Sequence, residues 1–277
     1  MRSRTYAHRR WALLVAAVTA VLAGAGCSAE TGTAVPENAA VSTVGGSGAT
    51  ASPTATVDPC AGASGTCQVV RIVDVDGDGT PDPVAIAYSS DAPAPGIAFG
   101  TSHITTRVGI NGTVHSVTQN VSGSAYTTPL DIFRGAFAIS RAHGADLALH
   151  LVRGQGNAEQ FSVIGWNGAE LVPLPQPPIP GATSMATPGI WYLGSSHGKQ
   201  DSIVCRTPGE IAVVSLSAAT QEGIPIPGGG RRTENYFTFS ANAWQPRGSD
   251  TTADSSFSYA WDAHTNAFRC TPLGTAG

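Results

Sequence analysis

The sequence predicts an all-β domain of antiparallel hairpins. Through residues 58–277, apolar residues mostly alternate with polar ones, which is the period of a strand with one buried face. Asn-Gly pairs at 111–112 and 167–168 each separate two such segments, and this pair favours a two-residue hairpin turn. The one short helical pattern covers residues 135–143. An open propeller-like stack or a β-sandwich, stapled by disulfides, fits these features.

Several short segments carry the strand pattern. They are residues 68–73, 84–88, 103–110, 113–118, 161–166, 170–174, 190–193, 199–205, 236–244, 256–261 and 267–270. Prolines cluster at 173–180 and 225–227. Because proline has no N–H to donate to a sheet, we expect loops at both places.

One stretch, Asp74-Val-Asp-Gly-Asp-Gly-Thr-Pro-Asp82, has carboxylates at its first, third, fifth and ninth positions. Calcium takes six to eight oxygen ligands, and a tight loop with acids on alternate residues turns such oxygens inward. Four carboxylates this close repel one another unless a cation lies among them. The sequence therefore predicts a structural calcium site whose ligands are Asp74, Asp76, Asp78, Thr80 through its carbonyl, and Asp82. The alternative is an Asp/Gly turn that binds nothing.

The pattern D-x-D-x-D-G-x-x-D resembles the calcium loops of FG-GAP and VCBS repeats and, more loosely, those of dockerins and EF-hands. An EF-hand has a bidentate Glu at the twelfth position, where this chain has Ala85. Residues 84–88 also read as a strand and not as a helix. The resemblance to FG-GAP and VCBS repeats is therefore the closer one, and it implies four-stranded, blade-like units.

Residues 1–26 have the features of an export signal, with four arginines before an apolar run at 11–23 that is too short to span a bilayer. The small residues before Cys27 resemble a bacterial lipobox, although Gly24 stands where Leu is usual. This resemblance implies a lipoprotein with a lipidated Cys27. An ordinary secretory signal with an incidental cysteine is the alternative, and both the general and the twin-arginine export routes stay open.

Residues 28–57 are mostly Ser, Thr, Ala, Gly and Val, so we expect a flexible tether between the lipidated Cys27 and a domain at 58–277. Removal of residues 1–26, which hold four arginines and no acid, takes the formal charge from −4 to −8. Nucleic acid requires a basic surface, so such a charge argues against it as a partner.

The domain has four cysteines, and an even number in an exported protein predicts two disulfides with three possible pairings. We expect Cys60–Cys67, which closes a short loop, and Cys205–Cys270, which ties the C-terminal strand to the domain. Zinc binding is the alternative, but the Cys-x₂-Cys spacing typical of such sites is absent from the sequence.

An internal repeat is one interpretation of three acidic residues that each precede an apolar run. Asp82, Asp146 and Glu210 are spaced by 64 residues each time. The spacing is comparable with that of a four-stranded repeat, and coincidence among many short strands is the alternative. Of the three copies, the first alone has the full set of carboxylates.

Residues Gly194–Gly198 match G-x-S-x-G, the nucleophile elbow of α/β-hydrolases, with Asp254 and His264 downstream in the right order. The elbow needs a helix after its nucleophile, here Ser196, whereas residues 199–205 have a strand pattern. A secreted serine hydrolase is therefore the alternative function, and a polar loop between strands is the simpler interpretation. The other histidines of the domain show no metal-binding spacing.

The sequence thus predicts an exported, lipid-anchored protein that acts as a binding or structural module of the cell envelope. Its expected location is the extracytoplasmic face of the membrane, where its partner would be an unidentified envelope protein or glycan. Lys199 is the one lysine of the chain, which also has 33 glycines and 19 prolines, and this composition suggests a GC-rich bacterium.

Overall fold

A computed structural model describes residues 57–95, 98–122, 126–155, 158–179, 187–194, 198–207, 209–221, 224–254 and 261–277. The predicted signal, Cys27 and almost all of the tether lie outside these residues. The compact unit spans Ala51–Gly277. Within the described part of the chain, no helix is both long and apolar enough to cross a membrane.

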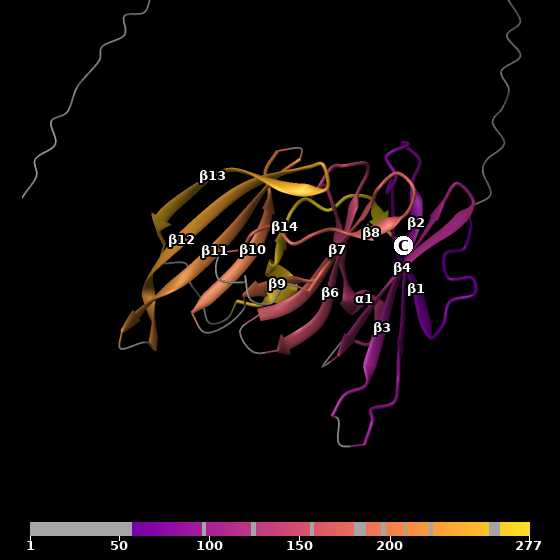
Figure 1. The fold of residues 1–277 in the computed structure, drawn as a ribbon, viewed down its shortest axis with the longest axis horizontal. Helices are drawn as coiled ribbons and strands as arrows, with labels where there is room; N and C mark the ends of the chain where they lie inside the picture. The colour runs from indigo at the N-terminus through magenta and orange to yellow at the C-terminus, as the bar shows by residue number, and fades with distance from the viewer. Residues whose placement is uncertain are drawn as a thin grey trace, which may run out of the picture. The chain divides into compact units, whose positions relative to one another are not determined.

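The fold is all-β, as the sequence predicts, and its strands form three sheets (Figure 1). Sheet A has the order β15-β1-β2-β3-β4 and is antiparallel throughout. Its strands are β1 (Thr66–Val73), β2 (Asp82–Ser90), β3 (Thr101–Ile110), β4 (Thr113–Ser122) and β15 (Thr275–Ala276). The Asn111-Gly112 turn joins β3 to β4, which confirms the predicted hairpin.

Sheet B has the order β5-β6-β7-β8, and β9 also pairs with β7. Its strands are β5 (Phe133–Phe137), β6 (Asp146–Gln155), β7 (Ala158–Trp166), β8 (Leu171–Pro173) and β9 (Trp191–Gly194). Sheet C has the order β13-β12-β11-β10-β14. Its strands are β10 (Lys199–Cys205), β11 (Glu210–Gln221), β12 (Ile224–Ser240), β13 (Ala243–Ala253) and β14 (Phe268–Arg269). Two short helices are described, α1 (Pro129–Ile132) and α2 (Ala263–Asn266).

Sheet B is buried on both faces. In β6, Leu147 and Leu149 belong to a core shared with sheet A, whereas Ala148 between them belongs to a core shared with sheet C. Successive side chains of a strand point to opposite faces, so a strand between two cores needs an unbroken apolar run. The three sheets therefore form an open stack with sheet B in the middle. Strand β5 of this sheet contacts β1 of sheet A, and its strand β9 contacts β10 of sheet C.

The C-terminal segment, residues 261–277, connects all three sheets. It runs from β14, which pairs parallel with β10 in sheet C, to β15 on β1 in sheet A (Figure 1). Between them, the backbone N–H of Leu273 donates to the carbonyl of Ala136 in sheet B at 2.8 Å. Both predicted disulfides are present, and Cys205–Cys270 fixes this segment to the end of β10.

Three local predictions are wrong. Residues 135–143 form no helix, because 135–137 end β5 and the rest is a loop. Pro225 and Pro227 lie within β12, where β11 is the one partner strand because β13 begins to pair only at Arg231. Proline is tolerated on such an edge. The predicted strand 236–244 is split by a turn at Ala241-Asn242, and both of these residues have positive φ.

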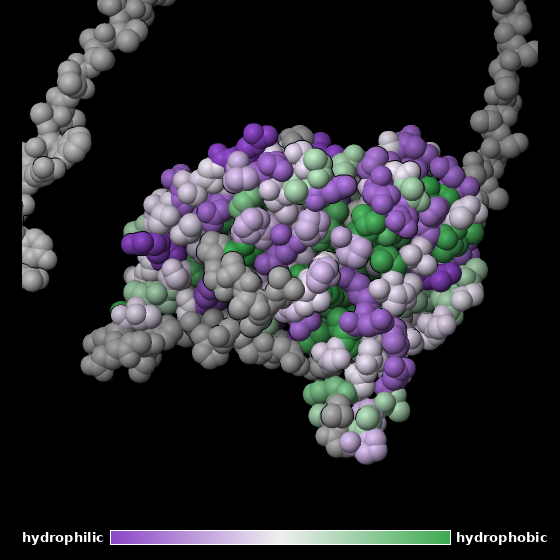
Figure 2. All heavy atoms as spheres, viewed as in Figure 1, coloured by the Kyte–Doolittle hydropathy of each residue, from purple (hydrophilic) through white to green (hydrophobic). Residues whose placement is uncertain are grey.

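The predicted strand 256–261 lies outside the described residues except for Trp261, whereas β14 falls within the predicted strand 267–270. On the face in Figure 2, hydrophilic residues are interspersed with hydrophobic ones. Three large apolar side chains of the described residues are exposed, namely Ile72, Phe99 and Leu130.

Candidate metal centre

The acidic loop joins β1 to β2 and is held by its own carboxylates. Asp74 accepts the backbone N–H groups of Gly77 at 2.6 Å and Gly79 at 2.9 Å. Asp76 accepts from the N–H of Asp78 at 3.1 Å, and Asp78 accepts from the N–H of Thr80 at 2.6 Å. Asx turns of this kind fold the backbone tightly, so these bonds help to bring the alternate acids of the loop together.

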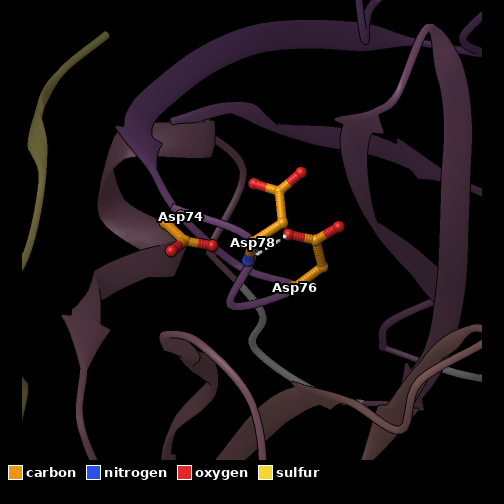
Figure 3. Close-up of side chains that lie close together, drawn as sticks. All are labelled: Asp74, Asp76 and Asp78. Carbon is orange, nitrogen blue, oxygen red and sulfur yellow. Dashed lines mark hydrogen bonds between the residues drawn. The ribbon is translucent and has the colours of Figure 1, made fainter. Parts of the chain in front are cut away.

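Three of the five predicted ligands lie close together. One oxygen from each of Asp74, Asp76 and Asp78 lies within 4.8 Å of the other two, and these side chains line the same loop (Figure 3). Thr80 is exposed and lies at the end of this turn. Oxygen ligands of calcium lie 2.3–2.6 Å from the ion, so pairs of them at such separations can share one.

Asp82 is more buried than the other acids and begins β2. It is 5% exposed, and its Oδ2 accepts the backbone N–H of Val75 at 2.9 Å. Burial and, to a smaller extent, the nearby charges of Asp76, Asp78 and Asp74 raise the pKa of this carboxyl to about 6, although the Val75 N–H lowers it. Within the described part of the chain, no cationic side chain forms an ion pair with any of these four acids.

A second copy of this loop joins β5 to β6. Asp146 begins β6, 64 residues after Asp82, and its Oδ2 accepts the N–H of Ile139 at 3.0 Å, as Asp82 accepts that of Val75. Val75 and Ile139 are both fully buried. The repeat predicted from Asp82 and Asp146 is therefore present in the backbone, although Ala138, Ser140 and Ala142 replace the three clustered acids.

A third copy joins β9 to β10, and its acid is Asp201 and not Glu210. The N–H of Gly194 donates to Asp201 Oδ2 at 2.8 Å, again across seven residues. The ammonium of Lys199 lies 3.1 Å from the same oxygen, so this copy carries a fixed cation. Glu210 begins β11 and its N–H donates to the carbonyl of Thr207, a contact that neither Asp82 nor Asp146 has, so its place in the predicted repeat is wrong.

The two ends of the G-x-S-x-G segment, Gly194 and Gly198, belong to this third copy. Ser196 lies outside the described residues, and the segment leads into β10, a strand where the hydrolase elbow requires a helix. Asp254 follows β13, and its backbone N–H donates to Gly230. The glycine at 198 thus has an explanation in the repeat, since Gly198 has φ +77° and its counterpart Gly79 has φ +87°.

A pair of histidines went unnoticed in the sequence. His150 in β6 is fully buried, and its Nδ1 lies 3.1 Å from Nδ1 of His264 in α2. Its Nε2 lies 2.6 Å from Oε2 of Glu159, in a contact that lacks the alignment of a hydrogen bond. Burial, then the charges of Arg134 and His150, lower the pKa of His264. These histidines are 114 residues apart, so no local spacing could reveal them.

Comparison of the chain with family models, with curated proteins and with solved structures finds no match. The site must therefore be interpreted from its own geometry.

Proposed function

We propose that the protein is an exported, lipid-anchored module of the cell envelope whose acidic loop holds one structural calcium ion. The ligands would be Asp74, Asp76, Asp78 and Asp82, with the Thr80 carbonyl and water. The ion would fix how β1 meets β2, and no reaction is assigned to it. The module itself would bind or support an envelope protein or glycan.

The observation that supports this proposal is the unequal charge of the three copies. In the third copy a lysine ammonium lies 3.1 Å from the buried acid, and in the second copy one buried acid is held by backbone N–H groups and a serine hydroxyl. In the first copy, three more carboxylates surround the buried one, and no described cation balances them. Buried charges are normally paired or bound to metal, and oxygen ligands suit calcium.

The calcium site can be tested by thermal unfolding of the full chain in millimolar calcium and in chelator. We expect calcium to raise the melting temperature, because an ion that binds the folded state alone stabilises it by about 1.4 kcal/mol at ten times Kd. Without a position-twelve Glu, a Kd of about 10⁻⁴–10⁻³ M is expected. Asp78→Ala should abolish the rise, whereas Asp250→Ala, on exposed strand β13, should keep it. No calcium effect on the native chain, with no heat of binding, would contradict the site.

The lipid anchor has its own test. Native protein should fractionate with the membrane, and Cys27→Ser should release it or leave its precursor uncleaved, since stable attachment needs the acyl chains. Normal processing and equal membrane retention of this variant would show that Cys27 carries no anchor. Ester hydrolysis that Ser196→Ala removes would favour the hydrolase instead.

A further inference from the structure

A cavity of about 500 Å³ lies between the first and second loop copies. Its walls are the end of β1 with Asp74, the loop 138–145, and the C-terminal residues 273–275. The N–H of Ala145 donates to the carbonyl of Asp74 at 2.9 Å, and a Cβ on Gly144 would lie 2.5 Å from that same oxygen. Backbone contacts thus hold the walls at fixed distances, so the cavity is preformed.

One residue of this cavity has an unfavourable backbone conformation. Arg141 has φ +51°, and it takes the place that Gly77 has in the first copy, where φ is +82°. Left-handed backbone is easy for glycine but costs other residues free energy, and such strain clusters at functional sites. Arg141 is exposed and forms no ion pair within the described part of the chain. An arginine at a position that suits glycine indicates a use for the guanidinium.

The rest of the lining defines the ligand chemistry. Most of it is apolar, with Val73, Ala138 and Leu273 among the residues, whereas Arg141 brings a positive charge and His143 brings a polar ring. We propose that the cavity binds a small carboxylate with a short aliphatic group, whose carboxylate contacts Arg141 and whose aliphatic part packs on Val73 and Leu273. Arginine binds carboxylates through paired, charge-assisted hydrogen bonds.

This inference rests on the proposed calcium site, because Asp74 also lines the cavity and Asp76 and Asp78 lie next to it. Without a metal ion these acids repel an anion, and with calcium their charge is offset. Ligand binding should therefore depend on calcium. The free acid of an aliphatic chain and the C-terminus of a peptide share this chemistry.

Calorimetry on the full chain can test the proposal with hexanoate for an aliphatic acid, N-acetyl-leucine for a peptide C-terminus, and hexanamide as the uncharged match. In calcium, we expect saturable binding of at least one carboxylate and about tenfold weaker binding of hexanamide. Arg141→Asn, which tolerates left-handed backbone, should weaken the carboxylate about tenfold or more and keep the calcium-induced rise in melting temperature. Arg247→Gln, in strand β13, should bind as the native chain does.

The outcomes distinguish failure of the cavity proposal from failure of the calcium proposal. A calcium effect on melting together with no carboxylate binding, or with equal binding by Arg141→Asn, would overturn the cavity proposal alone. Carboxylate binding that persists in chelator and is lost in Arg141→Asn would support the cavity and contradict its dependence on calcium. Tighter binding of N-acetyl-leucine than of hexanoate would identify a peptide C-terminus as the ligand, and the reverse would identify an aliphatic acid.

Discussion

Asp146 shows what a buried carboxyl group does in this repeat when no acidic cluster surrounds it. It accepts the N–H groups of Ile139 and Ser140 and the hydroxyl of Ser140, and these bonds shape the second loop. Burial nevertheless prevails over these bonds and raises its pKa to about 6. The sequence indicated an acid at this position but could not indicate its environment, because burial depends on both neighbouring sheets.

A pH dependence of stability follows from Asp146. Its pKa is higher in the folded chain than the ordinary value of 3.8, so the folded state binds this proton more tightly. The resulting stabilisation is fully present below pH 3.8 and is lost as the pH rises through about 6. Between pH 7 and pH 5, the free energy of unfolding should rise by about 1 kcal/mol more in the native chain than in Asp146→Asn.

Urea unfolding at both pH values, in chelator, measures this difference. The raised pKa of Asp82 and the lowered pKa of His264 also make stability depend on pH, but both residues are present in the two proteins and their contributions cancel in the comparison. Equal changes in the native chain and in Asp146→Asn would show that the pKa of Asp146 is ordinary in the folded state.

At the scale of elements, predictions succeeded where local chemistry decides the structure. The Asn111-Gly112 turn and the short Cys60–Cys67 loop depend on neighbouring residues. The same holds for the grouping of Asp74, Asp76 and Asp78, where the calcium ion stays a prediction. The predictions failed where residues distant in the sequence decide the local structure. Pro225 and Pro227 are tolerated because β13 stops short of them, and the Ala241-Asn242 turn has no glycine to signal it. The cavity and the histidine pair each bring together segments that are far apart in the sequence.

The two disulfides should contribute unequally to stability. Cys60–Cys67 closes a loop of sequence separation 7, whereas Cys205–Cys270 has a separation of 65 and holds β14 beside β10. A longer closed loop removes more entropy from the unfolded chain. On this basis, loss of the first disulfide should lower the free energy of unfolding by about 2 kcal/mol, and loss of the second by about 4 kcal/mol. Guanidinium unfolding of the two double Cys→Ser variants measures these values. A larger loss from the Cys60/Cys67 variant would contradict this order.

For the whole molecule, the C-terminal segment is the part that joins the three sheets. Its strands pair with β10 and β1, and Leu273 bonds to β5 between them. Among the described residues, sheets A and C share no core, since each packs on sheet B through a separate cluster. Cooperative unfolding of the three sheets should therefore depend on this segment as well as on sheet B.

Gly274 offers a specific way to detach the segment from sheet A. It has φ +71°, and a Cβ there would lie 2.2 Å from the backbone carbonyl oxygen of Ile72, so Gly274→Ala must shift β15 away from β1. Gly62→Ala is the matched control, because Gly62 has φ +68° but no atom within 4 Å of the added Cβ. Both variants should lose about 1 kcal/mol of folding stability because alanine disfavours positive φ, and only Gly274→Ala adds the steric clash with Ile72.

Hydrogen exchange read separately for strands of sheets A and C tests this role. In the native chain and in Gly62→Ala, we expect the slowest amides of both sheets to exchange through one common opening, as in a cooperative unit. In Gly274→Ala, the amides of β1 and β2 should exchange faster while those of β10 and β11, still joined to the segment through Cys205–Cys270, stay protected. Equal acceleration in both sheets would mean that sheet B alone couples them and that the C-terminal segment only adds stability.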